Sequence, residues 1–186
     1  MENIIRITTE RLQLRPVQME DADSIFAYRS NALVNQYQGW IPKTLEDVNH
    51  FISTKVSPEI NLPGTWFQFV FMKKDNRELI GDVGVHFLNS DAFQVELGCT
   101  LNKDHQGKGY ATEALTETIN YLFNELNKRR IIASVDPGNL PSISLFERLE
   151  FRKESHFKES LLINGEWVND LVYYLLKDEW FKRSNR

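Results

Sequence analysis

The chain has 186 residues, of which 41% are hydrophobic and 26% charged, a composition typical of one soluble globular domain over residues 1–186. The formal net charge of −4 argues against a nucleic-acid partner, and no apolar run approaches the roughly 20 residues that cross a bilayer. The one cysteine, Cys99, excludes an internal disulfide and fits a reducing compartment, so a cytoplasmic protein with no membrane partner is expected.

The first third of the chain is predicted to form a strand and two helices. Leucines alternate with polar residues over residues 9–16, as in a half-buried strand. The apolar spacing then becomes helical over residues 20–33. Thr44 stands three residues before Asp47, which resembles a capping box and predicts a second helix ending near Lys55.

Three strands are predicted next, over residues 66–72, 79–87 and 93–101. The third has the clearest alternation between two faces, as expected of a strand with one face in the core. Its apolar face carries Phe93, Val95, Leu97, Cys99 and Leu101, and its polar face carries Gln94, Glu96, Gly98 and Thr100.

Two glycines, Gly107 and Gly109, stand between this strand and a helical pattern over residues 109–127. The first N–H groups of a helix have no partner of their own, and the helix dipole adds positive charge at that end. The junction therefore predicts an anion-binding loop with the Lys108 ammonium group at its rim.

Two familiar phosphate loops do not fit this junction. A P-loop needs Ser or Thr after the lysine, where Gly109 stands, and a Rossmann fingerprint needs a glycine at position 112, where Thr stands. The pattern that remains is Gln106-x-x-Gly109-x-Ala111.

The last third of the chain begins with a β-branched strand over residues 131–135, which implies a right-handed parallel crossover from strand 93–101. A helix over residues 141–149 follows, with Asn139 as its candidate N-cap. Two further strands, 152–163 and 167–176, are joined by Asn164-Gly165, a strong hairpin signal. The four histidines show no metal-ligand spacing, so no metal is expected.

The pattern Gln106-x-x-Gly109-x-Ala111 resembles the pyrophosphate loop of the GNAT acetyltransferases. The opening segment Arg11-Leu12-x-Leu14-Arg15 and the later Glu96-Leu97-Gly98 and Asn139-x-x-Ser142 are similar to the RimJ/RimL-type branch of that family. The resemblance covers nearly the whole chain. It implies an α+β fold with a mixed, mostly antiparallel central sheet and helices on both faces.

The resemblance also implies a function, which is direct transfer of an acetyl group from acetyl-CoA to a primary amine. The cofactor would lie in a cleft where strands 93–101 and 131–135 splay apart. The implied cofactor-binding residues are the backbone of Cys99, Thr100 and Leu101, the loop residues Gln106, Gly107, Lys108, Gly109, Tyr110 and Ala111, and also Asn139 and Phe146. Tyr37, Trp40 and Trp66 are expected to line the acceptor side.

Two residues are candidates for the acid–base chemistry. Glu96 would act as a general base through water, or it is simply a solvated or salt-bridged carboxylate. Ser142 would protonate the leaving thiolate, with Ser144 as the nearby alternative, or it is only a first-turn residue of its helix. Asn139 has two compatible roles, helix N-cap and hydrogen-bond partner of the cofactor. Cys99 is expected to behave as a small hydrophobic residue and not as a nucleophile.

Three positions depart from the family pattern. Glu150 stands where the family usually has glycine, so a positive φ there would strain the backbone. Phe146 stands where a tyrosine is frequent, and it has no hydroxyl to donate a proton. Cys99 stands where an aromatic residue is common.

The acceptor cannot be read from these patterns. A protein N-terminus, an aminoglycoside-like antibiotic and a small polyamine all remain open. Two rival functions also remain, which are a non-catalytic acyl-CoA-binding or sensor module and transfer of a longer acyl group. The exposed edge of the last hairpin leaves a homodimer open.

Overall fold

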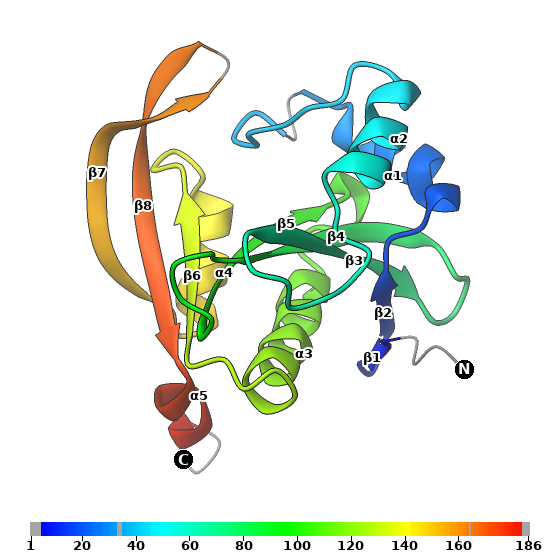
Figure 1. Ribbon diagram of the computed structural model, residues 1–186. Helices are drawn as coiled ribbons and strands as arrows, with labels where there is room; N and C mark the ends of the chain where they lie inside the picture. The colour runs from blue at the N-terminus through cyan, green and yellow to red at the C-terminus, as the bar shows by residue number, and fades with distance from the viewer. Residues whose placement is uncertain (1–4, 33–34, 164, 184–186) are drawn as a thin grey trace.

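The computed structural model describes residues 5–32, 35–163 and 165–183, which form an eight-stranded sheet with helices on both faces (Figure 1). The strands, in spatial order, are β1 (Ile7–Thr8), β2 (Leu12–Pro16), β3 (Thr65–Lys73), β4 (Leu79–Phe87), β5 (Gln94–Leu101), β6 (Arg130–Val135), β8 (Glu166–Leu176) and β7 (Arg152–Ile163). Every neighbouring pair is antiparallel except β5 and β6. The predicted α+β fold with a mixed, mostly antiparallel sheet is confirmed.

The helices divide between the two faces of the sheet. They are α1 (Ala22–Arg29), α2 (Leu45–Thr54), α3 (Tyr110–Asn124), α4 (Leu140–Arg148) and α5 (Lys177–Arg183), with 3₁₀ turns η1 (Met19–Asp21) and η2 (Lys103–His105). The main core lies on the α3 and α4 face, and a smaller core lies under α1 and α2. None of the helices in the described ranges is long and apolar enough to cross a membrane.

Most of the predicted elements are present within a few residues of their expected ends. The Thr44 capping box is formed, because the Thr44 hydroxyl accepts from the Asp47 N–H and the Asp47 carboxylate accepts from the Thr44 N–H. The first predicted helix is shorter than expected and ends at Arg29; Leu33 lies outside the described residues. Helix α3 ends at Asn124, close to Asn127, whose φ of +51° is incompatible with a continuing helix. The hairpin of β7 and β8 is present, although Asn164 at its turn lies outside the described residues.

One residue on the polar face of β5, Thr100, is buried, and its cross-strand partner on β4 belongs to a charged cluster that joins β4 to α1. Asp82 on β4 is 1% exposed and forms an ion pair with Arg29, whose Nε lies 3.0 Å from the Asp82 carboxylate. The Tyr28 hydroxyl and the Gln68 amide donate to the same carboxylate. Asp82 is the cross-strand partner of Thr100, which is only 5% exposed.

The charge states within this cluster are set by burial and by the Asp82 carboxylate. Burial raises the pKa of the Tyr28 phenol well above its usual value, and the Asp82 charge raises it further. Burial acts to lower the pKa of Arg29, but the Asp82 carboxylate raises it overall. The Tyr28 phenol and the Arg29 guanidinium therefore both hydrogen-bond to the Asp82 carboxylate, which gives these buried polar groups the partners that they need inside a protein.

Helix α4 ends in a Schellman motif that uses Phe146 and Glu150. The Phe151 N–H donates to the Phe146 carbonyl at 3.0 Å, and the Glu150 N–H donates to the Glu147 carbonyl at 2.9 Å. The Phe146 and Phe151 rings pack edge to face with centroids 5.1 Å apart, the hydrophobic contact that often accompanies this motif. Glu150 has φ +65°, so the expected positive φ is present at a residue that has a Cβ.

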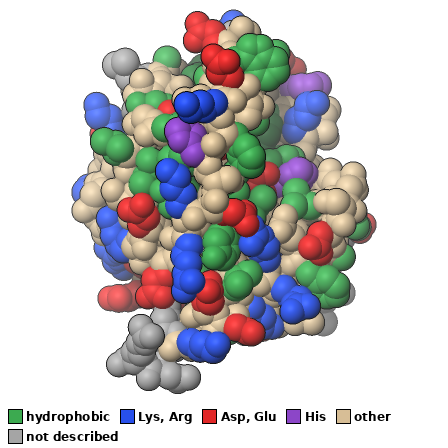
Figure 2. Space-filling model, turned by 90° about the vertical axis from the view of Figure 1, so that its left-hand side faces the viewer, with side chains coloured by type: hydrophobic (Ala, Val, Ile, Leu, Met, Phe, Trp, Pro, Cys, Tyr) green, Lys and Arg blue, Asp and Glu red, His purple; other side chains and the backbone are tan. Residues whose placement is uncertain are grey.

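The outer hairpin of β7 and β8 forms the side of the molecule seen in Figure 2, where hydrophobic side chains are scattered among acidic and basic ones. Several large hydrophobic residues of this hairpin are exposed: Phe157, Leu161, Leu162 and Trp167. β7 is also the last strand of the sheet order, so one of its edges has no neighbouring strand in the described chain. Association of two copies through this edge stays a prediction.

Because a left-handed conformation costs a residue with a Cβ about 1–2 kcal/mol, Glu150→Gly should stabilise the protein. Glycine also gives the unfolded chain more conformational freedom, which reduces this gain. The expected net increase in the free energy of unfolding is roughly 0.5–1 kcal/mol. Denaturant unfolding of both forms measures it. Glu150→Ala is the control, because it removes the side chain but keeps the strain, and it should be close to neutral. Equal stabilisation by both variants would mean that the carboxylate, and not the backbone, is unfavourable here.

Candidate active site

The parallel strands β5 and β6 pair over only three residue positions and then separate. The paired positions run from Gln94–Arg130 to Glu96–Ile132. Beyond this point β5 continues along β4 to Leu101, and β6 continues along β8 to Val135. The two strands therefore splay apart as expected, and each keeps its hydrogen bonds to the neighbour on its outer edge.

A cleft of about 950 Å³ lies next to this separation. Its walls come from the end of β5, the glycine loop, the first turn of α3, helix α4 and a segment between α1 and α2. The residues that line it are Asn35, Gln36, Tyr37, Gln38, Cys99, Thr100, Leu101, Lys103, Gln106, Gly107, Gly109, Tyr110, Ala111, Thr112, Glu113, Asn139, Pro141, Ser142, Ser144, Leu145 and Arg148.

The glycine loop has the backbone that an anion site requires. Gly107 and Gly109 have φ values of +72° and +82°, which residues with a Cβ adopt rarely. Gly109 is the N-cap residue of α3, so the first-turn N–H groups of the helix open onto the cleft that Tyr110 and Ala111 line. The Gln106 side chain closes the loop on β5, because its Nε2 donates to the Leu101 carbonyl at 3.1 Å.

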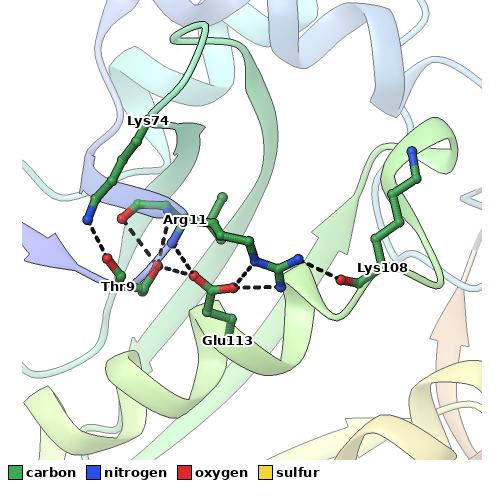
Figure 3. Close-up of polar contacts among 6 residues, drawn as sticks. Thr9, Arg11, Lys74, Lys108 and Glu113 are labelled. Atoms are coloured by element: carbon green, nitrogen blue, oxygen red, sulfur yellow. Dashed lines mark hydrogen bonds and ion pairs between the residues drawn. The ribbon is translucent and has the colours of Figure 1, made fainter.

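The strand β2 is attached to this loop through Arg11 and Glu113 (Figure 3). The Arg11 guanidinium lies 2.6 Å from the Glu113 carboxylate and donates to the Lys108 carbonyl at 3.0 Å. The Thr9 hydroxyl and the Arg11 backbone N–H also donate to Glu113. Burial acts to raise the pKa of Glu113, but these hydrogen bonds from Thr9 and Arg11 lower it overall, which favours the ionised carboxylate.

The cleft brings together most of the predicted cofactor-binding residues: Cys99, Thr100, Leu101, Gln106, Gly107, Gly109, Tyr110, Ala111 and Asn139. Two predicted members do not line it. Lys108 instead donates from its Nζ to the Asp104 carbonyl at 2.7 Å, within the loop. Phe146 is 5% exposed and packs on Phe151 in the core, so its placement gives no support to a cofactor contact.

Glu96 is also outside the cleft lining, although it lies on the last β5–β6 pair before the strands separate. Its carboxylate lies 3.4 Å from His86 Nδ1, and both side chains are 26% exposed. His86 stacks in turn on Trp66, with ring centroids 4.7 Å apart. On the same face of β5, Gly98 separates Glu96 from Thr100, and a Cβ at Gly98 would meet no atom within 4 Å. The space over Gly98, between Glu96 and Thr100 on this face, is therefore open.

Ser142 lies in the first turn of α4. Ser142 and Ser144 both line the cleft. The Asn139 side chain is the N-cap of this helix and accepts from the Ser142 N–H at 3.2 Å, as predicted.

Burial raises the pKa of the Cys99 thiol to about 12, so the reactive thiolate is scarce at neutral pH. The Thr100 hydroxyl is buried and has no hydrogen-bond partner in the described structure, although it belongs to a residue that lines the cleft.

The segment Asn35 to Gln38 also lines the cleft, and of its residues the sequence indicated only Tyr37. Asn35 is 1% exposed, and its amide nitrogen donates to the carbonyls of Tyr28 and Asn31 at 2.8 and 3.0 Å. The side-chain oxygen of Asn35, Oδ1, is buried and has no hydrogen-bond partner in the described structure. Of the expected aromatic residues only Tyr37 lines the cleft; Trp40 stacks on Phe51 with centroids 4.4 Å apart. A buried asparagine in a connecting segment has no periodic signal that could reveal it.

Comparison with known proteins agrees with this geometry. The family model of the acetyltransferase (GNAT) domain matches residues 11–152. The uncharacterized N-acetyltransferase p20 of Bacillus licheniformis is 35% identical over 173 residues, covering 92% of this chain and 96% of its own. The ribosomal protein uS5-alanine N-acetyltransferase of Escherichia coli (strain K12) is 30% identical over 185 residues, covering 95% and 93%.

Among solved structures, a GNAT-family acetyltransferase from Bacillus anthracis matches with a TM-score of 0.82 and 28% identity, covering 94% of this chain and 100% of that one. Its fold therefore extends over the sheet, the cleft and the outer hairpin alike. The chain belongs to the GNAT family of N-acetyltransferases, in its RimJ/RimL-like branch.

Proposed function

We propose that this protein transfers an acetyl group from acetyl-CoA directly to a primary amine. The observation that carries the proposal is the cleft beside the β5–β6 separation, with an anion-binding glycine loop at its wall. Acetyl-CoA supplies the activated acetyl thioester. The first-turn N–H groups of α3 would hold its pyrophosphate, since unpartnered amides and the helix dipole both favour an anion.

The lining of the cleft suits such a donor in two further respects. Thr100 offers a buried hydroxyl without a partner, which is costly unless a bound molecule satisfies it. The end of β5 also offers backbone groups on the edge that β6 has left. The backbone of residues Cys99 to Leu101 would bind the thioester end of the donor through these groups.

Glu96 is our candidate general base. An ammonium group must lose a proton before it can attack a thioester, so a base is needed near the acceptor. Thr100 lies four residues further along the strand, about 13 Å at 3.3 Å per residue, which is too far for direct contact with the reacting centre. Glu96 would therefore accept the proton through water in the open space over Gly98.

Ser142 is our candidate for protonating the leaving thiolate. It lines the cleft from the first turn of α4, and Phe146 on the same helix has no hydroxyl and is buried. Cys99 is poorly suited to covalent catalysis because of its raised pKa. The raised pKa of Cys99 favours direct transfer without an acetylated enzyme.

A protein N-terminus is the acceptor that we expect first, because the E. coli relative at 30% identity is an N-acetyltransferase of an alanine in ribosomal protein uS5. The test is thiol release from acetyl-CoA with three acceptors: a peptide with N-terminal alanine, a polyamine and an aminoglycoside. We expect release to match acetylated amine, with the peptide favoured. Binding of acetyl-CoA without turnover of any amine would support the acyl-CoA sensor instead. Stronger competition by longer acyl-CoAs would support transfer of a larger group.

Glu96→Gln should lower kcat by about 10²–10⁴-fold, the usual effect of losing a general base, while acetyl-CoA still binds. Raising the pH should restore part of the rate, because the free amine then forms without help. Rates over a range of pH and calorimetry of acetyl-CoA binding measure both effects. Glu154→Gln is the control, because its ion pair with Arg130 lies outside the cleft lining. A Glu96→Gln rate close to wild type at every pH would remove Glu96 from the mechanism.

Ser142→Ala should lower kcat for acetyl-CoA and have a much smaller effect on an activated thioester, whose thiolate leaves without a proton. Parallel assays with the two donors measure this difference. Ser144→Ala is the matched control on the same helix turn, since Ser144 also lines the cleft. If Ser144→Ala shows the donor-dependent loss and Ser142→Ala does not, the proton donor is Ser144. Equal losses for both donors in Ser142→Ala would contradict a role in protonation.

A further inference from the structure

Arg11 makes contacts that a simple surface residue does not make. It stands immediately before β2 in the sequence, yet its partners lie 97 and 102 residues further along the chain. Its Nε and one terminal nitrogen each lie 2.6 Å from Glu113 Oε2. Another terminal nitrogen donates to the Lys108 carbonyl at 3.0 Å (Figure 3). The guanidinium also lies over the Tyr110 ring, 4.3 Å from its centroid.

Glu113 presents an electrostatic problem for an anion-binding loop. It lies in the first turn of α3 and lines the cleft where the first-turn amides are exposed. A carboxylate there stabilises the helix dipole, but it also repels any phosphate that approaches the same amides. Its hydrogen bonds favour the ionised form, so the negative charge is not removed by protonation. A positively charged group must therefore pair with the Glu113 carboxylate before the loop can bind an anion.

The contact with Lys108 has a second consequence, which comes from the geometry of the peptide bond. The bond between Lys108 and Gly109 is planar and trans, so the Lys108 carbonyl and the Gly109 N–H point in opposite directions. Arg11 holds the carbonyl on its own side of the loop. It thereby turns the Gly109 N–H away from β2, while the glycine itself lines the cleft.

We infer that Arg11 is a positioning residue for the anion-binding loop. It neutralises Glu113 and fixes the orientation of the Gly109 amide, so that the loop can hold the pyrophosphate of the acetyl donor. The inference rests on the proposed function. The alternative is that Arg11 only attaches β2 to α3 and has no specific effect on the anion.

The experiment compares acetyl-CoA with acetyl-pantetheine, which carries the same thioester but no pyrophosphate. Arg11→Met should weaken calorimetric CoA binding and kcat/KM for acetyl-CoA on the order of tenfold, the size of charge effects at a helix N-terminus. kcat/KM for acetyl-pantetheine should stay within about twofold. Arg11→Lys keeps the charge but lacks the planar fork, so its loss should be intermediate.

Glu113→Gln in the Arg11→Met background is the decisive variant. If Arg11 acts by neutralising Glu113, removal of the carboxylate should restore most of the CoA affinity that Arg11→Met lost. The double-mutant coupling measures this directly. Arg15→Met is the matched control, because Arg15 forms a comparable pair with Asp21 at 2.7 Å and lies on β2, with neither residue lining the cleft. It should leave the ratio between the two donors unchanged.

Three results separate the possibilities. Equal losses for acetyl-CoA and acetyl-pantetheine in Arg11→Met would show that Arg11 has only a structural role. A loss confined to acetyl-CoA that Glu113→Gln does not restore would overturn the neutralisation of Glu113. Wild-type protein that does not bind CoA would overturn the proposed function itself. If Arg11→Met does not fold, Arg11→Lys with and without Glu113→Gln gives the same comparison, and a donor ratio equal to that of wild type overturns the inference.

Discussion

The separation of β5 from β6 after three paired positions is the constraint on which the rest of the site depends. Each strand keeps a complete ladder on its outer edge, with β4 on one side and β8 on the other, so the sheet remains continuous around the gap. Backbone groups at the inner edges lose their strand partners, and such groups need others inside a protein. An extended polar ligand can supply them. The cleft is thus a direct product of strand geometry and not of a missing element.

The charged cluster around Asp82 joins α1 to the strands β3 and β4. Three side chains from α1 and β3 converge on one buried carboxylate, and together they leave it fully hydrogen-bonded. This attaches α1 to the centre of the sheet through polar contacts, where an apolar helix–sheet contact would be more usual. Asp82 is also the cross-strand partner of Thr100, a buried residue that lines the cleft. Removing one partner would leave charge buried without compensation.

The two arginines of the opening segment form one long-range ion pair and one local ion pair. Arg15 pairs with Asp21 only six residues away and stabilises the entry to α1. Arg11 pairs with Glu113 across more than half of the chain and connects the first strands to the loop at the cleft. Arg15 binds both carboxylate oxygens of Asp21, whereas two nitrogens of Arg11 lie at one carboxylate oxygen of Glu113. The distant pair can act on the site because one of its members belongs to the first turn of α3.

The sequence by itself determined the elements whose signals are local. Alternation predicted β5, the Thr44 capping box predicted the start of α2, and the glycines at 107 and 109 predicted a strand-to-helix loop. Together with the family resemblance these signals identified most of the residues that line the cleft. Periodicity and turn chemistry act over a few residues, which is why they can be read without a structure.

Only the tertiary structure decided how faces and distant segments meet. It buried Thr100 on a face that alternation marks as polar, beside Asp82, the residue that binds Arg29 and Tyr28 of α1. It placed Phe146 in a Schellman contact and not in the cleft, and it added Asn35 to the lining. These outcomes depend on packing between residues far apart in the chain. No local pattern encodes them, because burial is a property of the partner surface as much as of the residue itself.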